Sequence, residues 1–413
     1  MKAEKLPLFS SSSQYLSFIT LLFILFFFTI SFEYVKYKDF KSEELIETSG
    51  KIVNIYHKND YDVLKVRTND YTFFTSVILN HGFKKQDFID LTILTKRVDF
   101  IDYLKNFYTQ SLNIYPKNRV DFAKQLSQKI NEQHIHSNVS ELFNALFLAH
   151  PLGEDSRDFF ASLGLSHLIA ISGFHLGVLS FVLYGVFNLL YAPIHQRYFP
   201  YRNKKHDIIV VTSVILFSYL LLTGIVPSLL RAFIMFVLGV ILLRNNIKLF
   251  SFETLLFTFL IIIALFPKYL FSLSLWFSLT GVFYIFLFIK YFEKLPKILS
   301  IFIFNFWIFF CFNPIVHFFF SQTTYEQLLS PILTLLFTLF YPIELFAHII
   351  GYGSFLDDVL LVLLSSSLTV FEVLTPWWFF LVYIIISFFS IISKYAFILL
   401  NILFVGFNLY LFL

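Results

Sequence analysis

Two histidines, a serine and a glycine interrupt an apolar run that is long enough to span a membrane. The stretch 164–191 places His167 and His175 on either side of Ser172 and Gly173. Polar groups in hydrocarbon cost free energy unless they face protein or water. These residues therefore fit three roles: the lining of a polar path, a catalytic site, or hydrogen bonds between packed helices.

The spacing of the two histidines bears on where their side chains could point. In one unbroken helix, His167 and His175 would lie about two turns apart on the same side. However, Gly164, Gly173 and Gly177 weaken a regular helix and permit close backbone approach, as in the broken helices that line cavities in membrane proteins. The pattern therefore makes a break or kink plausible within this run.

Metal binding and hydrolysis both need more groups than this motif supplies. A catalytic zinc is held by three protein ligands, whereas the motif offers two histidines and no carboxylate, so we predict no metal and no cofactor. A serine hydrolase needs an acid that orients its histidine, but Asp155 and Asp158 precede the span. We assign no catalytic residue, and a hydrolase using Ser172 and His175 stays an alternative.

A second polar position lies in the stretch 223–235. Arg231 falls about one turn into an apolar segment, where a buried arginine costs roughly 2.5 to 3.5 kcal/mol on insertion scales unless it is paired or hydrated. Pro227 suits the first turn of a helix, and Ser228 and Arg231 project toward the same side. A guanidinium offers a planar fork to an anion such as phosphate. The alternative is an arginine that reaches the lipid headgroups.

The composition shows what must position these residues. Of the 413 residues, 57% are hydrophobic, 14% are charged and 59 are phenylalanine, which excludes an ordinary soluble core and predicts a polytopic membrane protein. Cys311 is the one cysteine, so an intramolecular disulfide is impossible and the redox compartment stays open. The apolar stretch 16–30 lacks an A-x-A-like cleavage site, and we expect residues 1–32 to form a retained first membrane helix.

Residues 33–117 differ from the rest because they hold much of the charge and show short alternating runs. These runs cover 51–56, 62–67, 71–79 and 90–95, and turn residues separate them. The pattern is typical of a small antiparallel barrel, and we favour an OB-like β domain. Such domains often bind single strands through aromatic residues on a basic face. The alternative is a barrel whose aromatic residues only form its core and turns.

The remaining sequence divides into a connector and a multi-spanning domain. Residues 118–139 predict a linker or interfacial helix with one apolar face. Residues 140–413 form the multi-spanning domain, in which 140–150 is too short to span and could be re-entrant. The expected spans, which with the first helix make about eleven, are 166–191, 208–223, 229–243, 249–266, 271–289, 298–320, 331–350, 358–375, 377–393 and 395–413.

The placement of Lys and Arg in short loops predicts the orientation. The loops 192–207, 244–248 and 290–297 are basic and are expected in the cytoplasm, whereas the alternate loops contain only Lys268. Lys2 and Lys5 then place the N-terminus in the cytoplasm. The β domain and the C-terminus are expected outside it.

Two of these stretches also carry a family resemblance. Residues 153–175 are similar to the pattern R-x2-F-x3-G-x2-H-x2-A-x-S-G-x-H, and residues 227–232 are similar to P-S-x2-R-A. Both patterns belong to the ComEC family of competence proteins, the inner-membrane channels of natural transformation. Residues 271–277 resemble the family's Q-L-S-F segment only in outline and carry no functional assignment.

The resemblance implies a transport channel, not an enzyme, in the bacterial cytoplasmic (inner) membrane. The channel would import single-stranded DNA into the cytoplasm, and Arg157 and Arg231 would meet its phosphates. The expected partners are single-stranded DNA, an extracytoplasmic DNA-receptor protein, a cytoplasmic ATPase or helicase, single-strand-binding proteins and membrane lipid. The residues expected to line or shape the DNA path are His167, Ser172, Gly173, His175, Arg231, Arg157 and Ser228.

The chain departs from many family members in one respect. Those members continue into a metallo-β-lactamase-like domain that is proposed to act as a nuclease, but this sequence has no H-x-H-x-D-H motif. We therefore expect a short form in which another polypeptide would degrade the second strand. Two alternatives to a DNA channel are a membrane-embedded hydrolase and a small-anion permease, both using the His/Ser motif.

Overall fold

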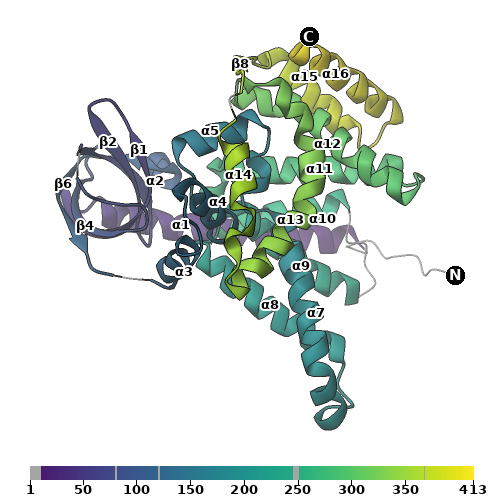
Figure 1. The fold of residues 1–413 in the computed structure, drawn as a ribbon, viewed down its shortest axis with the longest axis horizontal. Helices are drawn as coiled ribbons and strands as arrows, with labels where there is room; N and C mark the ends of the chain where they lie inside the picture. Colours follow the sequence, from purple (N-terminus) through teal and green to yellow (C-terminus); the bar gives the residue numbers. More distant parts are fainter. Residues whose placement is uncertain (1–10, 80, 120, 245–250, 367) are drawn as a thin grey trace.

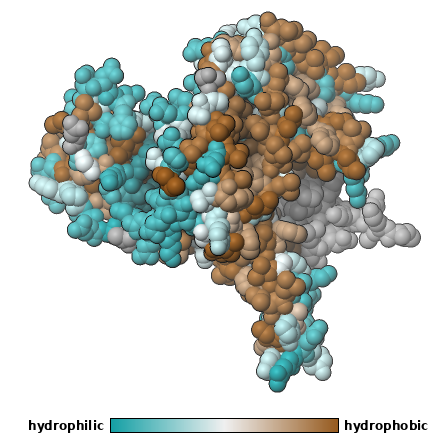
Figure 2. All heavy atoms as spheres, in the orientation of Figure 1, coloured by the Kyte–Doolittle hydropathy of each residue, from teal (hydrophilic) through white to brown (hydrophobic). Residues whose placement is uncertain are grey.

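The computed structural model describes residues 11–79, 81–119, 121–244, 251–366 and 368–413. A small β domain lies at one side of a larger helical part (Figure 1). Hydrophobic side chains cover much of the helical part, whereas the β domain and the segments next to it are largely hydrophilic (Figure 2). This contrast agrees with a multi-pass membrane protein that carries one polar domain.

The first helix connects the two parts. Helix α1 (Ser12–Phe40) runs past the expected boundary at residue 32 and ends beneath the β domain. It continues because its last turns have a packing partner: Phe40 is buried in the β-domain core, and Tyr37 packs against that core. At the other end, Leu22 packs against helix α10 (Phe252–Leu265) through Phe257 and Ala264.

The β domain is a six-stranded sheet with the order β5-β3-β2-β1-β4-β6. Neighbouring strands are antiparallel except β3 and β5, which are parallel, and helix α2 (Phe100–Lys105) precedes β5. The strands are β1 (Leu45–His57), β2 (Tyr61–Arg67), β3 (Thr72–Ile78), β4 (Phe88–Leu94), β5 (Phe107–Tyr108) and β6 (Ser111–Lys117). The alternation seen in the sequence thus produces a sheet, while closure into an OB-like barrel stays a prediction.

Strand β1 is long enough to serve two neighbours. Its first half pairs with β4 and its second half with β2, and a register shift falls between Ile52 and Asn54. Gly50 lies at this change of partner, where a Cβ atom would collide with a methyl group of Val66. Beneath the bend, Ile52, Leu64 and Phe73 are fully buried. The change of partner along β1 therefore places β2 and β4 over one apolar core.

Two short helices join the β domain to the membrane part. Helix α3 (Phe122–Asn131) begins at the N-cap Asp121 and is shorter than the expected connector 118–139. Helix α4 (Ser137–Leu148) covers the expected re-entrant piece, and nearly all its side chains are buried. Salt bridges from Lys51 of β1 to Asp121 (2.7 Å) and from Lys85, in the turn before β4, to Glu141 (2.8 Å) hold both helices against the β domain.

The membrane part contains long helices with short connections. After α5 (Glu154–Ser162), the remaining helices are α6 (Ser166–Ile169), α7 (Gly173–Tyr198), α8 (Lys204–Leu222), α9 (Pro227–Arg244), α10, α11 (Leu273–Phe292), α12 (Lys297–Phe319), α13 (Ser330–Ile350), α14 (Asp357–Leu364), α15 (Trp377–Phe389) and α16 (Lys394–Phe412). Short 3-10 helices are η1 (Pro267–Phe271), η2 (Tyr325–Leu329) and η3 (Gly353–Leu356).

The described residues support fewer full-length spans than the sequence predicted. Seven helices are long and apolar enough to cross a membrane: Ser12–Phe40, Gly173–Tyr198, Lys204–Leu222, Leu273–Phe292, Lys297–Phe319, Tyr325–Ile350 and Lys394–Phe412. Three more apolar helices are shorter, namely Pro227–Ile241, Phe252–Leu265 and Trp377–Phe389. The figure of about eleven spans is therefore not confirmed.

The expected span 358–375 is wrong as a single helix. Helix α14 ends at Leu364, and strand β8 (Phe371–Glu372) then pairs with β7 (Gln322–Thr323). Serine residues follow Leu364 in the sequence, and their side chains compete for backbone hydrogen bonds, as the bond from Ser365 Oγ to the Val362 carbonyl shows. The two ends of the segment 324–370 therefore lie next to each other, because β7 and β8 pair.

The orientation stays a prediction. Its first two markers, Lys2 and Lys5, and Lys248 in the loop 244–248 lie outside the described residues. Helices α7 and α8 project from the rest of the helical part (Figure 1). The basic residues predicted to face the cytoplasm lie where these helices connect: Arg197 in the last turn of α7, Arg202 in the loop, and Lys204 and Lys205 in the first turn of α8.

Candidate functional site

The polar motif around residue 172 is a helix start. Helix α6 ends at Ile169, residues 170–172 are not helical, and α7 begins at Gly173. Ser172 is the N-cap: its Oγ accepts from the Phe174 N–H (3.2 Å), while the Ser172 N–H donates to His175 Nδ1 (3.1 Å). This reciprocal arrangement is a capping box in which histidine replaces the usual Glu or Gln. The break suggested by the glycines is therefore present.

The capping box also fixes the tautomer of His175. Because Nδ1 accepts a backbone hydrogen bond, the neutral imidazole carries its proton on Nε2. Nε2 is buried and has no hydrogen-bond partner among the described residues, and the ring lies edge-on to Tyr341 at 4.5 Å between centroids. An unpaired buried donor costs about 1–3 kcal/mol, so this N–H is available to an acceptor that reaches it.

Arg231 is buried against the start of α7. Its Nε donates to Ser278 Oγ on α11 (2.6 Å), and its Nη1 contacts Met235 Sδ (3.2 Å). Among the described residues no carboxylate forms an ion pair with the guanidinium, although the side chain is only 6% exposed. A buried cation usually has a paired anion, so this arginine carries an uncompensated positive charge.

Gly173 allows the two positive groups to approach each other. A Cβ atom at residue 173 would lie 3.1 Å from Arg231 Nη2 and 3.4 Å from Ala232 Cβ. The N-terminus of a helix carries a partial positive charge and unpaired N–H groups. The start of α7 and the guanidinium therefore place positively polarised hydrogen-bond donors within one buried region. Such a region suits a phosphate or another anion.

Ser228 holds this region together. Its hydroxyl donates to the carbonyl of Ile171 (2.6 Å), which ties the first turn of α9 to the segment just before α7. Ser228 and Arg231 thus face the same segment, as their spacing predicted. The Ser228 hydroxyl thus contacts the backbone of a neighbouring segment.

His167 and Arg157 lie apart from this arrangement. His167 belongs to α6, where its Nδ1 donates to the Gly164 carbonyl (3.0 Å) and its Nε2 lies 3.4 Å from Thr334 Oγ1 of α13. Arg157 is exposed on α5 and pairs with Asp158 (3.2 Å) and more loosely with Glu154 (3.8 Å). The structure therefore does not bring Arg157 to Arg231, and the two histidines are not on one helix.

Sequence reasoning missed the neighbours that complete the site. Ser278 binds the guanidinium from α11, and Phe337 and Tyr341 of α13 enclose the ring of His175. The loosely matching stretch 271–277 ends one residue before Ser278, so a polar residue near that segment was the available signal. The aromatic residues of α13 gave none, because aromatic residues occur throughout the chain.

A second cationic group lies where the β domain meets the helices. Arg67 Nη1 donates to the carbonyl of Gly224 in the α8–α9 turn (3.3 Å), and Lys268 pairs with Glu33 (2.9 Å) and donates to the carbonyl of Asp70. Partial burial, together with the charge of the neighbouring Arg67, lowers the pKa of Lys65. Both cations would be stabilised by an anion.

The fold and the site define a class of protein: a polytopic membrane protein with a small, largely hydrophilic β domain and a buried, cationic helix junction. The family model described as Competence protein matches residues 150–412, which is more than half of the chain. The chain therefore belongs to the competence protein family, as its motifs indicated, and this membership ties it to DNA uptake in transformation. No curated protein and no solved structure matched the chain.

Proposed function

We propose that this protein is the inner-membrane channel through which single-stranded DNA enters the cytoplasm during natural transformation. Family membership supports a part in DNA uptake. The observation that carries the finer proposal is Arg231, a buried arginine without an ion-pair partner among the described residues, placed against the start of α7. A phosphodiester chain supplies the negative charge that this region lacks.

The contacts suit transit better than tight binding. A polyanion must enter and leave, so a channel gains from few and weak contacts. The region offers one guanidinium, the N–H of His175 Nε2 and the α7 N-terminus, whereas a DNA-binding groove carries a row of cations. Each phosphate would meet these donors and then pass on.

The β domain would guide the strand toward this region. Lys65 and Arg67 lie on one face of β2, and the Lys65 ammonium lies 5.5 Å from the centre of the Phe74 ring. Arg67 contacts the turn that leads into α9, the helix of Arg231. A basic and aromatic surface that ends at this turn fits a path for single-stranded nucleic acid.

The remaining partners belong to the same proposal. A DNA-receptor protein would deliver the strand outside the membrane, and a cytoplasmic ATPase or helicase would pull it, because the sequence has no G-x4-G-K-[ST] motif. Single-strand-binding proteins would receive the strand inside. The basic residues where α7 connects to α8, Arg202 in the loop and Lys204 and Lys205 in the first turn of α8, offer these partners a contact surface.

One observation favours a second candidate, a membrane hydrolase. Ser172 Oγ lies 3.1 Å from His175 Nδ1, which is within reach for proton transfer. The same nitrogen already accepts the Ser172 N–H, and no described acid contacts Nε2. Turnover of a lipid-linked substrate by the purified protein, abolished in Ser172→Ala, would support the hydrolase over the channel.

The channel is tested by DNA import in a deletion strain that expresses variants. Arg231→Gln should lower the entry of labelled DNA into the cytoplasm at least about tenfold, since a hydrogen bond to a charged group contributes about 1.5–3 kcal/mol. DNA uptake to the cell surface and the amount of inserted protein should stay unchanged. Arg197→Gln, at the exposed end of α7, is the matched control. Normal import by Arg231→Gln would refute the assignment.

A further inference from the structure

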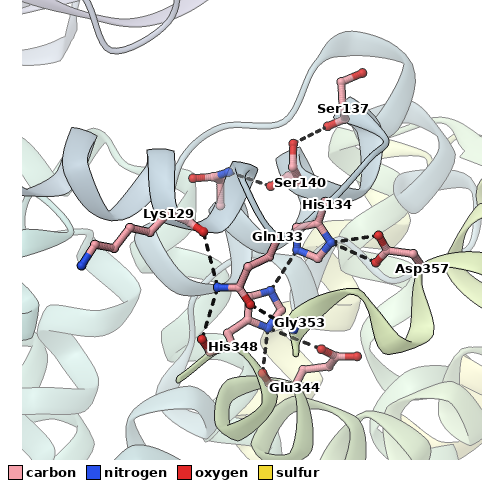
Figure 3. A network of polar contacts seen from close by, with 10 residues as sticks. Lys129, Gln133, His134, Ser137, Ser140, Glu344, His348, Gly353 and Asp357 are labelled. Atoms are coloured by element: carbon pink, nitrogen blue, oxygen red, sulfur yellow. Dashed lines mark hydrogen bonds and ion pairs between the residues drawn. The ribbon is translucent and has the colours of Figure 1, made fainter. Parts of the chain in front are cut away.

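A chain of buried polar groups joins three segments that are distant in sequence (Figure 3). His134, between α3 and α4, contacts Asp357 at the start of α14 through Nδ1 (2.9 Å to Oδ1). His134 Nε2 faces Nε2 of His348, in the last turn of α13, at 3.0 Å. The Nδ1 atom of His348 lies 2.8 Å from the Glu344 carbonyl oxygen. The His134 side chain is fully buried and that of His348 is 6% exposed.

Counting hydrogen atoms shows that this chain needs an extra proton. The contacts from Asp357 to His134, from His134 to His348 and from His348 to the Glu344 carbonyl are three hydrogen bonds, and each requires one hydrogen. A carboxylate and a carbonyl are acceptors only, and two neutral imidazoles supply two N–H groups. One more proton must therefore be present, or two lone pairs would face each other at hydrogen-bond distance.

We propose that His134 and His348 form a proton-binding site that holds one shared proton and thereby fastens the α3–α4 connection to the end of α13 and the start of α14. The bound species is an imidazole–imidazolium pair. Asp357 and Glu344 supply the compensating negative charge. This site is independent of DNA passage, so it can fail while the proposed channel function stands.

Carboxyl groups lie beside both histidines of the pair. Glu344 is fully buried, both its carboxylate oxygens lack hydrogen-bond partners among the described residues, and Oε2 lies 3.5 Å from His348 Nδ1. Burial lowers the pKa of His134, Asp357 and Glu344 oppose this effect, and the charge of His348 adds to it. Helix α4 contributes aromatic rings, with Phe143 stacked on His134 at 4.8 Å. An uncompensated carboxylate beside His348 is the group that an imidazolium there would neutralise.

The 3.0 Å separation distinguishes a shared proton from a shared metal ion. It equals an ordinary N–H···N hydrogen bond, whereas two histidines on one zinc at about 2.0–2.1 Å per bond keep their nitrogens farther apart. Among the described residues, no group of three side chains is arranged to hold a metal. A metal-bridged pair is therefore the competing outcome of the test.

Together with Gln133, the histidine pair links the α3–α4 connection to the end of α13 and the residues that follow it. The Gln133 amide donates to the His348 carbonyl (3.2 Å), and its Oε1 accepts from the Gly353 N–H (2.9 Å). Loss of the shared proton would oppose two Nε2 lone pairs, and a second added proton would oppose two N–H groups. The fastening therefore holds when one extra proton is bound, and it weakens as pH rises and that proton leaves.

Hydrogen–deuterium exchange of the full-length protein in nanodiscs tests the site. Opening of residues 132–136 and 351–358, corrected for the intrinsic pH dependence of exchange, should increase about tenfold between about pH 6 and about pH 9. In His348→Gln the amide can still donate to His134 but cannot titrate in this range, so the opening should not change with pH. His136→Gln, an exposed histidine on the same turn, is the matched control and should behave as the wild type.

Three outcomes would overturn the proposal. These are corrected opening that is constant with pH in the wild type, the full pH dependence in His348→Gln, and loss of protection on adding a chelator, which would assign the pair to a metal. If His348→Gln does not fold, nitrogen-15 NMR of the histidine-labelled wild type decides the question. The pair should show three protonated nitrogens and one bare nitrogen at about pH 6, and two bare nitrogens would contradict it.

Discussion

Glycine at residue 173 lets Arg231 lie against the first turn of α7 without being displaced by a side chain. The guanidinium Nη2 approaches to 3.1 Å from the place where a Cβ would be. The nearest polar partner of Arg231 is a serine hydroxyl, and a neutral hydroxyl compensates a buried charge less than a carboxylate does. Because Gly173 has no side chain, the positive N-terminus of α7 and the Arg231 guanidinium lie close together although they repel each other.

Replacing Gly173 by alanine should displace the guanidinium by a few tenths of an ångström. Transformation should fall about fivefold, since weakening one hydrogen bond by about 1 kcal/mol changes an equilibrium about fivefold. Gly177→Ala, one turn further along α7, is the control, because apart from the backbone of α7 itself no atom of the described residues lies within 4 Å of its Cβ position. Equal transformation frequencies in the two variants would show that the close approach has no functional role.

The Ser172 hydroxyl has a structural task that can be separated from chemistry. Ser172→Ala should destabilise the start of α7 by about 1 kcal/mol through loss of the N-cap, while Ser172→Asn should keep the cap and most of the transformation frequency. The measurement is transformation together with thermal unfolding in detergent. A complete loss of function in Ser172→Asn, with normal stability, would favour the nucleophile of the hydrolase alternative.

The residues of the site could be predicted only in part. The histidines, Ser172 and Arg231 were recognisable because polar residues are costly in apolar segments. Gly173 was recognisable because glycine weakens a regular helix, and Ser228 through its helical spacing from Arg231. Their partners were not, because Ser278 and Tyr341 come from helices distant in the chain. Arg157 lies on an exposed face of α5 apart from Arg231, because sequence proximity to the motif does not determine which face of a helix a residue occupies.

At the scale of elements, the sequence pattern predicted the strands and helices whose formation depends on residues close together in the chain. The first four strands follow the alternating runs because one face of each is buried, whereas β6 escaped detection because most of its residues are exposed on both faces. Apolar composition located the membrane helices but failed at 358–375, where pairing of β8 with β7 overrides hydropathy. The break before α7 followed from its glycines.

For the molecule as a whole, the β domain is joined to the helices by polar contacts that leave two cations on its β2 strand. If Lys65 and Arg67 meet phosphates, binding of single-stranded DNA by the nanodisc-embedded protein should weaken with salt. In Lys65→Gln/Arg67→Gln the slope of log affinity against log salt should decrease by about 1.4, which corresponds to two fewer neutralised phosphates. Lys96→Gln, an exposed lysine paired with Glu44, is the control. An unchanged slope would mean that β2 does not contact DNA.

The most direct test of the central claim asks whether the entering strand touches the start of α7. A photo-crosslinking phenylalanine analogue replaces Phe174, in the first turn of α7, or Phe181, which lies two turns along the same helix and is 80% exposed. Competent cells receive labelled DNA and are irradiated during uptake. The predicted result is a DNA adduct at position 174 and none at position 181. Efficient DNA import without any adduct at position 174 would contradict the proposed path.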